Sequence, residues 1–425
     1  MKNAFYISLI FTFFSAGLLA QPYSLEECKT MATENNAELR DKRIQEEISG
    51  LMKKQAISYL FPNVSGMGMI FEARNPIINL DLGILGKMQF LQDGMMASVM
   101  AVQPVFMGGK IINSIRLAQV GIQASELFTV QNRDEVLAQT EEYFWTLVTL
   151  YEKRKTVAIM QNVLDSLYKD VQQAHAVGIL GQNDVLKVKL QKNTLASQKI
   201  ELENGIFLCK MALAREVGKR VDSLDGFDIV VPESTIPANP LDFYTDPASA
   251  LALRTEYKLL DLGVQAARLE KKIETAGYLP QAGVGAAYYY ENFLDKNNWN
   301  GAVLAAVRVP ISDWGRGLHT IKQKQLAEKR AVIRQEDGYQ QLLMQIQQAW
   351  GTFVESYEKL LLADLSVEES QENARLNSEY FHAGTVSLTE LLAAQGFLQV
   401  SYDNRTEAYK AYRLAKSKYL QVTGR

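Results

Sequence analysis

Cysteine, positive charge and long apolar runs are all scarce in this chain of 425 residues. The two cysteines, Cys28 and Cys209, are too few for a disulfide framework. We expect two free thiols packed in helices, with one disulfide between them as the alternative. Basic residues do not outnumber acidic ones, and the formal net charge of −3 offers no basic surface for nucleic acid.

After the first 24 residues, no apolar run reaches the ~18 residues that a membrane-spanning helix needs. At the N-terminus, Lys2 precedes an apolar run and a stretch of small residues that ends at Ala20. This pattern predicts a secretory signal peptide over residues 1–20, with a buried N-terminal helix as the alternative. No cysteine follows directly, so we do not expect a lipid anchor there.

Proline is absent from residues 105–231 and from residues 311–425. Because proline costs ~3 kcal/mol inside a helix, these two segments are where very long helices can form. Glycines punctuate both segments, and the intervals between them are helical in pattern. The predicted long helices cover residues 108–177, 184–218, 315–382 and 388–423.

Apolar residues recur every seven positions in both segments, which is typical of coiled coils. In the second segment, small residues alternate with the bulky ones and permit close helix packing. An amphipathic helix in a compact bundle is the alternative, but such a helix would span roughly 100 Å at ~1.5 Å per residue. The recurring residues are Val136, Tyr143, Leu150, Val157, Leu164 and Val171, and then Tyr339, Ile346, Phe353, Leu360, Val367, Ala374 and Phe381.

Two shorter regions, residues 63–104 and 281–310, are rich in small and β-favouring residues. They predict two hairpins whose strands are close to the ~9–11 residues of a transmembrane β-strand. Aromatic residues gather at one strand end and predict a girdle at a membrane interface, with a tyrosine-rich soluble turn as the alternative. These aromatic residues are Tyr288, Tyr289, Tyr290, Phe293 and Trp299.

The two halves of the chain share one order of elements. Gly178 and Gly384 lie 206 positions apart, as do Pro104 and Pro310, each of which is expected to close a hairpin. Each half is predicted to contain a helix of roughly 35 residues, a hairpin, a long helix, a glycine turn and a returning helix. The sequence therefore predicts two pseudo-symmetric repeats. They cover residues 21–218 and 247–425, with residues 219–246 between them.

Several short motifs carry a resemblance to a known family. They are the SLEEC start at residues 24–28, the YLFP and GYLP junctions at 59–62 and 277–280, QPVFMGGK at 103–110, VPISDWGRG at 309–317, and the two glycine turns. Their order and duplication resemble the TolC family of outer-membrane efflux proteins over nearly the whole chain after the predicted signal peptide.

The resemblance implies a mainly α-helical fold with a membrane β-barrel. It implies a homotrimer in which each protomer gives four strands to one twelve-stranded barrel and long helices to an α-barrel tunnel. Residues 219–246 are the candidate for the family's equatorial domain. A periplasmic adaptor protein and an inner-membrane pump are the implied partners. The residues themselves also require oligomerisation, because four strands cannot close a barrel and open edges are not tolerated in lipid.

The glycine turns, at residues 178–183 and 383–387, would form the periplasmic tip of such a tunnel. Glycine at their starts predicts a positive φ and a reversal of the chain. The acids after each turn either support a helix start or face the lumen as an acidic ring, and both interpretations remain open. The candidate tip residues are Gly178, Gln182, Asp184, Phe381, Gly384, Val386, Leu388 and Glu390.

The tip also departs from the family. A second acid found in many members is replaced by Ala393, and a tyrosine and an arginine that latch the closed tip are replaced by Phe381 and Val386. Apolar packing of Phe381, Val386 and Leu388 is therefore the predicted means of closure.

Other candidate sites are weaker. His175 and His382 flank the turns and are expected to be solvated rather than to bind metal. Methionines around the first hairpin suggest either lipid-facing or subunit-facing packing, which we favour, or copper export. No phosphate loop, zinc motif or nucleophile motif is present, so no enzyme activity, cofactor or metal site is predicted. The methionines are Met67, Met69, Met88, Met95, Met96, Met100 and Met107.

Together these patterns predict an outer-membrane channel-tunnel that serves as the passive exit duct for efflux or type I secretion. An exported coiled-coil protein that makes no pore is the alternative. The sequence leaves the cargo and the partner pump open.

Overall fold

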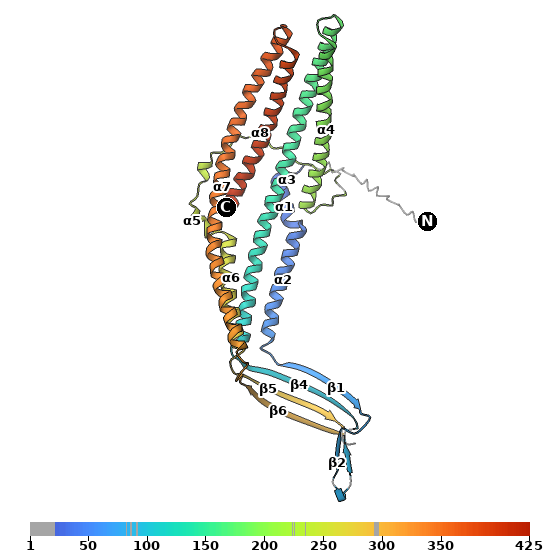
Figure 1. Ribbon diagram of the computed structural model, residues 1–425, viewed down its shortest axis with the longest axis vertical. Coiled ribbons are helices and arrows are strands. Elements are labelled where there is room, and N and C mark those ends of the chain that lie inside the picture. The colour runs from blue at the N-terminus through green and yellow to red at the C-terminus, as the bar shows by residue number, and fades with distance from the viewer. Residues whose placement is uncertain are drawn as a thin grey trace, which may run out of the picture.

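The protein is an elongated molecule with long helices along its axis and a curved sheet at one end (Figure 1). The computed structural model describes residues 22–425 except 82, 86, 91, 223, 225, 234 and 293–296. The predicted fold class, long antiparallel helices joined to a four-stranded sheet, is confirmed. The predicted signal peptide lies outside the described residues. Within the described part of the chain, no helix combines the length and apolar character needed to cross a bilayer.

Two helical hairpins form the upper part of the molecule in Figure 1. Helices α3 (Lys110–Ala176) and α7 (Arg316–His382) each contain 67 residues. Their returning partners, α4 (Gln182–Glu216) and α8 (Leu388–Val422), each contain 35. The first tip turn is shorter than predicted, because Gly181 is extended and already caps a helix that begins at Gln182.

The seven-residue pattern marks the packing seam of these helices. In α7, Ile346, Phe353 and Leu360 are buried, and the Phe353 ring lies 5.8 Å from that of Tyr412 and 5.9 Å from that of Tyr419 on α8. The predicted coiled-coil seam is therefore the contact between α7 and α8. In α3, the buried members of the pattern are Val136, Val157, Leu164 and Val171.

The first helix predicted in each half is broken in the structure. In the first half, α1 (Leu25–Asn35) and α2 (Ala37–Ser58) are separated by Asn36, whose backbone is extended with ψ of 132°. The Asn36 Oδ1 caps α2 by accepting from the Glu38 amide at 2.8 Å. Its Nδ2 donates to the Glu216 carbonyl at 3.0 Å, so a contact distant in sequence stabilises the break.

The second half repeats this division with a shorter first piece. Helix α5 (Pro247–Leu251) begins after Asp246, whose carboxylate accepts from the Ser249 amide at 2.9 Å. Helix α6 (Thr255–Ala276) begins after Arg254, which is extended with ψ of 137°. The prediction of one helix of roughly 35 residues was therefore wrong in both halves.

The segment before α5 lies at the middle of the molecule's long axis (Figure 1). It contains one short 3₁₀ helix, η2 (Pro240–Phe243), and a parallel bridge between Tyr23 and Ile229. The Tyr412 hydroxyl donates to the Ala238 carbonyl at 2.9 Å, which ties the segment to α8.

The four-stranded sheet joins the two halves of the chain. Strands β1 (Asn63–Glu72), β4 (Asp93–Met107), β5 (Gln281–Glu291) and β6 (Asn298–Arg308) lie in that order and are antiparallel throughout. The central pair, β4 and β5, comes from different halves. The only other described strands, β2 (Ile78–Asp81) and β3 (Lys87–Phe90), with η1 (Gly83–Leu85) between them, form an unpredicted hairpin beyond the sheet (Figure 1).

Strand β4 continues past Pro104, which was expected to close the hairpin. The register with β5 shifts between Pro104 and Phe106, as at a β-bulge. A bulge accommodates a residue that has no N–H to donate to the ladder, so the strand extends to Met107.

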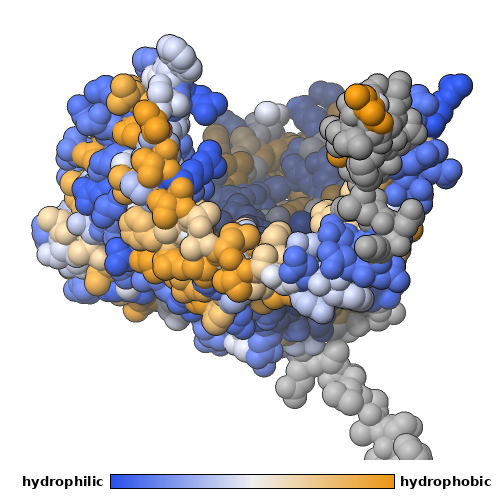
Figure 2. All heavy atoms as spheres, turned by 90° about the horizontal axis from the view of Figure 1, so that it is seen from below, coloured by the Kyte–Doolittle hydropathy of each residue, from blue (hydrophilic) through white to orange (hydrophobic). Residues whose placement is uncertain are grey.

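The helices form a single curved layer. Near the sheet, α2 packs on α3, α3 on α6 and α6 on α7; toward the tips, α3 contacts both α4 and α8, and α8 contacts α7. Seen from the sheet end, the molecule surrounds a hollow that is open on one side (Figure 2). This curvature gives the molecule a concave face and two free edges.

Candidate functional site: the two-faced sheet and the helical tips

One face of the sheet is almost entirely apolar. Residues that pair directly across antiparallel strands point to the same side, so the observed register assigns every side chain to a face. The one polar side chain in the middle rows, Gln103, donates from Nε2 to the Leu60 carbonyl at 2.8 Å. This apolar face consists of Val64, Gly66, Gly68, Ile70, Met95, Ala97, Val99, Ala101, Gln103, Ala282, Val284, Ala286, Tyr288, Tyr290, Trp299, Gly301, Val303, Ala305 and Val307.

The opposite face, called the polar face below, mixes polar and small residues with four methionines. A sheet with one apolar and one polar side has the alternation expected of a strand between lipid and a water-filled lumen. The polar face consists of Asn63, Ser65, Met67, Met69, Phe71, Met96, Ser98, Met100, Val102, Gln281, Gly283, Gly285, Ala287, Tyr289, Glu291, Asn298, Asn300, Ala302, Leu304, Ala306 and Arg308.

Three of the predicted interface aromatics form one cluster on the apolar face. The Trp299 ring lies 5.6 Å from that of Tyr288 and 5.0 Å from that of Tyr290. The Tyr290 hydroxyl donates to Asn297 Oδ1 at 2.8 Å, so its polar end lies beyond the last paired residues. Tyr289 points to the polar face and is not part of this cluster, as alternation along the strand requires. Phe293 lies outside the described residues.

Both edges of the sheet and of the helix layer lack a neighbour in the described chain. Strand β1 pairs only with β4, and β6 pairs only with β5. The helices at the two edges carry exposed apolar residues at spacings that return to one side of a helix. On α2 these are Ile44, Ile48 and Leu51; on α4 they are Leu190, Ile200, Phe207 and Leu208; and on α7 they are Leu326, Ile333, Met344 and Leu362.

The two tips have the same backbone geometry. Gly178 has φ of 78° and Gly384 has φ of 75°, as predicted from their places in the turns. In each turn, the residue after glycine donates its N–H to a carbonyl five residues earlier, which is the Schellman ending of a helix. The pairs are Ile179 to Ala174 and Thr385 to Tyr380, both at 2.9 Å.

The tip acids have partners within the chain. The Asp184 carboxylate lies 3.1 Å from Lys187 Nζ. The Glu390 carboxylate accepts from the Ser387 amide at 2.7 Å in a capping box. These contacts favour a role in starting the returning helices over a bare acidic ring. Gln182 is exposed at the first turn of α4.

The two tips are also joined to each other. Leu388 and Leu391 are buried in one cluster with Val185 and Val188, and Phe381 packs against it. Lys187 Nζ adds a hydrogen bond to Thr389 Oγ1 at 3.1 Å. Leu388 therefore packs inside the chain rather than in a contact between copies. Val386 is half-buried, and His175 Nδ1 lies 2.9 Å from the Leu180 carbonyl.

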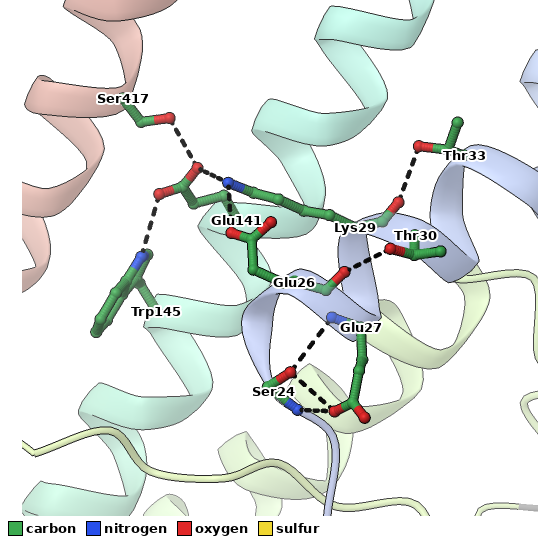
Figure 3. Close-up of polar contacts among 9 residues, drawn as sticks. All are labelled: Ser24, Glu26, Glu27, Lys29, Thr30, Thr33, Glu141, Trp145 and Ser417. Carbon is green, nitrogen blue, oxygen red and sulfur yellow. Dashed lines mark hydrogen bonds and ion pairs between the residues drawn. The ribbon is translucent and has the colours of Figure 1, made fainter.

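A buried carboxylate at the middle of the molecule was missed at the level of sequence. Glu141 of α3 is 5% exposed and binds donors from three helices (Figure 3). Its Oε2 lies 3.0 Å from Lys29 Nζ of α1 and 2.7 Å from Ser417 Oγ of α8. Its Oε1 accepts from Trp145 Nε1 at 3.3 Å. This cluster joins α1, α3 and α8 at the level where the neighbours of α3 change from α2 and α6 to α4 and α8.

The predicted free thiols are confirmed. Cys28 and Cys209 are both buried and unpaired with each other. Burial raises the pKa of each thiol to about 11. Among the residues that the structure describes, no group of three or more histidine, cysteine or acidic side chains is arranged to hold a metal ion.

Solved structures share this architecture over almost the full chain. The outer membrane protein VceC of Vibrio cholerae is 16% identical, with 94% of this chain and 96% of that chain covered and a TM-score of 0.79. The chain has the TolC-family fold. The CmeC outer membrane channel of Campylobacter jejuni is 15% identical, with 94% and 85% covered and a TM-score of 0.81. The open-state MtrE outer membrane channel of Neisseria gonorrhoeae is 14% identical, with 94% and 88% covered and a TM-score of 0.73.

No family model and no curated protein matches this sequence. At these identities the TolC-family fold is established by structure alone, and it agrees with the resemblance predicted from the motifs.

Proposed function

We propose that this chain is the outer-membrane channel of an export system. Three copies would close one twelve-stranded barrel in the outer membrane, and their helices would enclose a tunnel through the periplasm. The protein would provide a passive, water-filled exit duct for efflux or type I secretion. Energy would come from an inner-membrane pump that is linked to the channel by a periplasmic adaptor.

The observation that carries this proposal is the two-faced sheet with both edges open. In lipid, an unpaired edge leaves backbone N–H and C=O groups without partners, so the sheet is stable there only if it closes. Pairing β6 of one copy with β1 of the next would satisfy both edges. The apolar face would then meet lipid and the polar face would meet water, and the tyrosine–tryptophan cluster would lie at an interface.

The helix edges support closure by copies of the same chain. The exposed stripe on α7 lies on the edge opposite to those on α2 and α4, so neighbouring copies bring these stripes together. Burying each large apolar side chain contributes roughly 1.5–3 kcal/mol. Apolar residues would thus line the contacts between neighbouring copies in a closed trimer.

The tips suit an adaptor. Val177 and Ile179 are exposed at the first turn, and both turns are built from rigid Schellman endings. Exposed apolar residues on a rigid frame are typical of a docking surface. The adaptor would contact residues 175–188 and 380–394.

The test is expression of the full chain, followed by fractionation, native mass spectrometry and conductance in planar bilayers. We expect an outer-membrane trimer that conducts. The variant Ile333→Glu, Met344→Glu should lose the trimer, because it places charges in the proposed contact. The control Gln325→Glu adds charge at an exposed position on another side of the same helix and should assemble. A soluble fibre without conductance would support the structural coiled-coil alternative instead.

A further inference from the structure

The methionines of the first hairpin gather on the polar face of the sheet. Met69 of β1 pairs directly with Met96 of β4, and Met67 pairs with Ser98. Met100 is two residues after Ser98 and therefore shares its face. Met67, Met69 and Met100 are 61%, 46% and 41% exposed, so they do not serve as core packing.

If the barrel closes as proposed, these four side chains face its lumen and not the lipid. Met95, the neighbour of Met96 on the same strand, points to the apolar face and is the member that would meet lipid. The remaining residues of the polar face near its ends, such as Asn63 and Arg308, are those expected beside water. Three of these four methionines are exposed and Met96 is half-buried, so thioethers on a wetted wall need another explanation.

The thioether group has its own ligand chemistry. Methionine sulfur is a soft, uncharged ligand that selects Cu(I) and similar soft cations over hard ones. Directly opposed Cβ atoms in a sheet lie about 4.5–5.5 Å apart and diagonal ones about 7–8 Å. Met67, Met69 and Met96 are neighbours within these distances, and because methionine is unbranched and flexible, their three sulfurs can converge on one point above the strands. Met100 lies four residues from Met96, roughly 13 Å along the same strand, so it flanks the site and does not reach the same ion.

A carboxylate lies beside this group on the same face. Glu291 of β5 pairs in register with Met96, and its Oε1 accepts from Asn298 Nδ2 at 3.3 Å. Its negative charge would attract a cation toward the thioethers without replacing them as ligands. A site on a conduction path must bind weakly enough to release its ion, and neutral thioethers with one nearby charge meet that condition.

We propose that Met67, Met69 and Met96 form a binding site for a soft monovalent cation, Cu(I) or Ag(I), with Met100 beside it. The site's place in a lumen rests on the proposed channel function, because only closure of the barrel turns the polar face into a channel wall. The cation is a cargo that passes the site, not a resident cofactor.

The test measures Ag(I) binding to the purified full chain in detergent and chloride-free buffer, by equilibrium dialysis and elemental analysis. All proteins carry Cys28→Ala and Cys209→Ala, because thiols would also bind silver. The test variant replaces all four methionines of the polar face by leucine, which keeps their volume. The matched control is Met95→Leu, on the same strand and the opposite face.

We expect the parent and the Met95→Leu control to bind Ag(I) equally, and the fourfold variant to bind at least tenfold more weakly. Equal binding by the fourfold variant, or no binding by the parent, overturns the proposal. Circular dichroism checks that the fourfold variant is folded, and the double variant Met69→Leu, Met96→Leu serves if it is not. Conductance is recorded in parallel. Binding without conductance would refute the channel and keep the cation site. Conductance without binding would refute the cation site and keep the channel.

Discussion

Replacing Glu141 by glutamine tests whether the buried carboxylate holds α1 against the rest of the molecule. The amide has the same shape and, with its oxygen in the place of Oε1, still accepts from Trp145, so packing should change little. The charge opposite Lys29 is lost, and an NH₂ group faces the ammonium at a site where the structure places an oxygen 3.0 Å from Nζ. The expected result is local opening of α1.

The size of the effect follows from burial. Removing one partner of a fully buried ion pair costs about 3–5 kcal/mol. The Lys29 side chain is 25% exposed and can turn toward water, whereas that of Glu141 is 7% exposed. We therefore expect a smaller loss, about 2–3 kcal/mol, in the free energy of opening at α1.

Hydrogen exchange measured on the α1 amides is the appropriate assay, because the opening is local and global unfolding of a large protein is rarely two-state. Glu142→Gln is the control, since Glu142 is exposed and adjacent; it should change the same free energy by less than about 0.5 kcal/mol. The double variant Glu141→Gln, Lys29→Met should cost less than the two single changes together, by about 1–2 kcal/mol. Additive effects, or a loss no larger than that of the control, would refute this account.

Three further predictions concern other sites. Gly384→Ala should lower the free energy of unfolding by about 1–2 kcal/mol from the positive φ alone, because no atom lies within 4 Å of the added Cβ. Gly218→Ala adds a contact at 2.5 Å with Asn35 and should lower the melting temperature further. The reverse order of melting temperatures would contradict the steric argument. Burial raises the pKa of the Cys28 and Cys209 thiols to about 11. Both should therefore react with iodoacetamide at pH 8 far more slowly than free cysteine, as mass spectrometry of the intact protein would show. Equal reaction rates would exclude the buried placement.

The third concerns Asp403, whose Oδ1 has no hydrogen-bond partner in the part of the chain that the structure describes. Burial raises the pKa of this carboxyl in the folded protein, so the folded state binds the proton more tightly than the unfolded state does. Stability should therefore fall as pH rises from the usual aspartate pKa through the raised one. Asp403→Asn should raise the melting temperature near pH 7 and have no such effect in acid; a gain that is the same at all pH values would count against it.

Much of the fold was predictable because it depends on local chemistry. The proline-free segments and the seven-residue pattern predicted α3 and α7 within a few residues of their ends, and the glycines at 178 and 384 predicted both turns. The break at Asn36 was not predictable in the same way. It depends on a bond to Glu216, which is 180 positions away, and no local signal reports that partner.

The candidate sites divide along the same line. Alternation of side chains along a strand is enough by itself to place Tyr289 on the face opposite to Tyr288 and Tyr290. The gathering of methionines on one face could not be predicted in this way, because it needs the register between β1 and β4. Likewise, Glu141 stands within an acidic pair in the sequence, and only packing distinguishes it from its exposed neighbour Glu142.

By itself, the sequence determined where helices run without interruption, where side chains alternate along strands and where the chain reverses. Those properties follow from proline, glycine and apolar spacing, which act over a few residues. Only the tertiary structure decided which face of each helix and strand contacts which neighbour. Pairing β4 with β5 and packing α3 on α8 bring together residues from different halves of the chain. The apolar face, the polar face and the buried carboxylate all result from those long-range contacts.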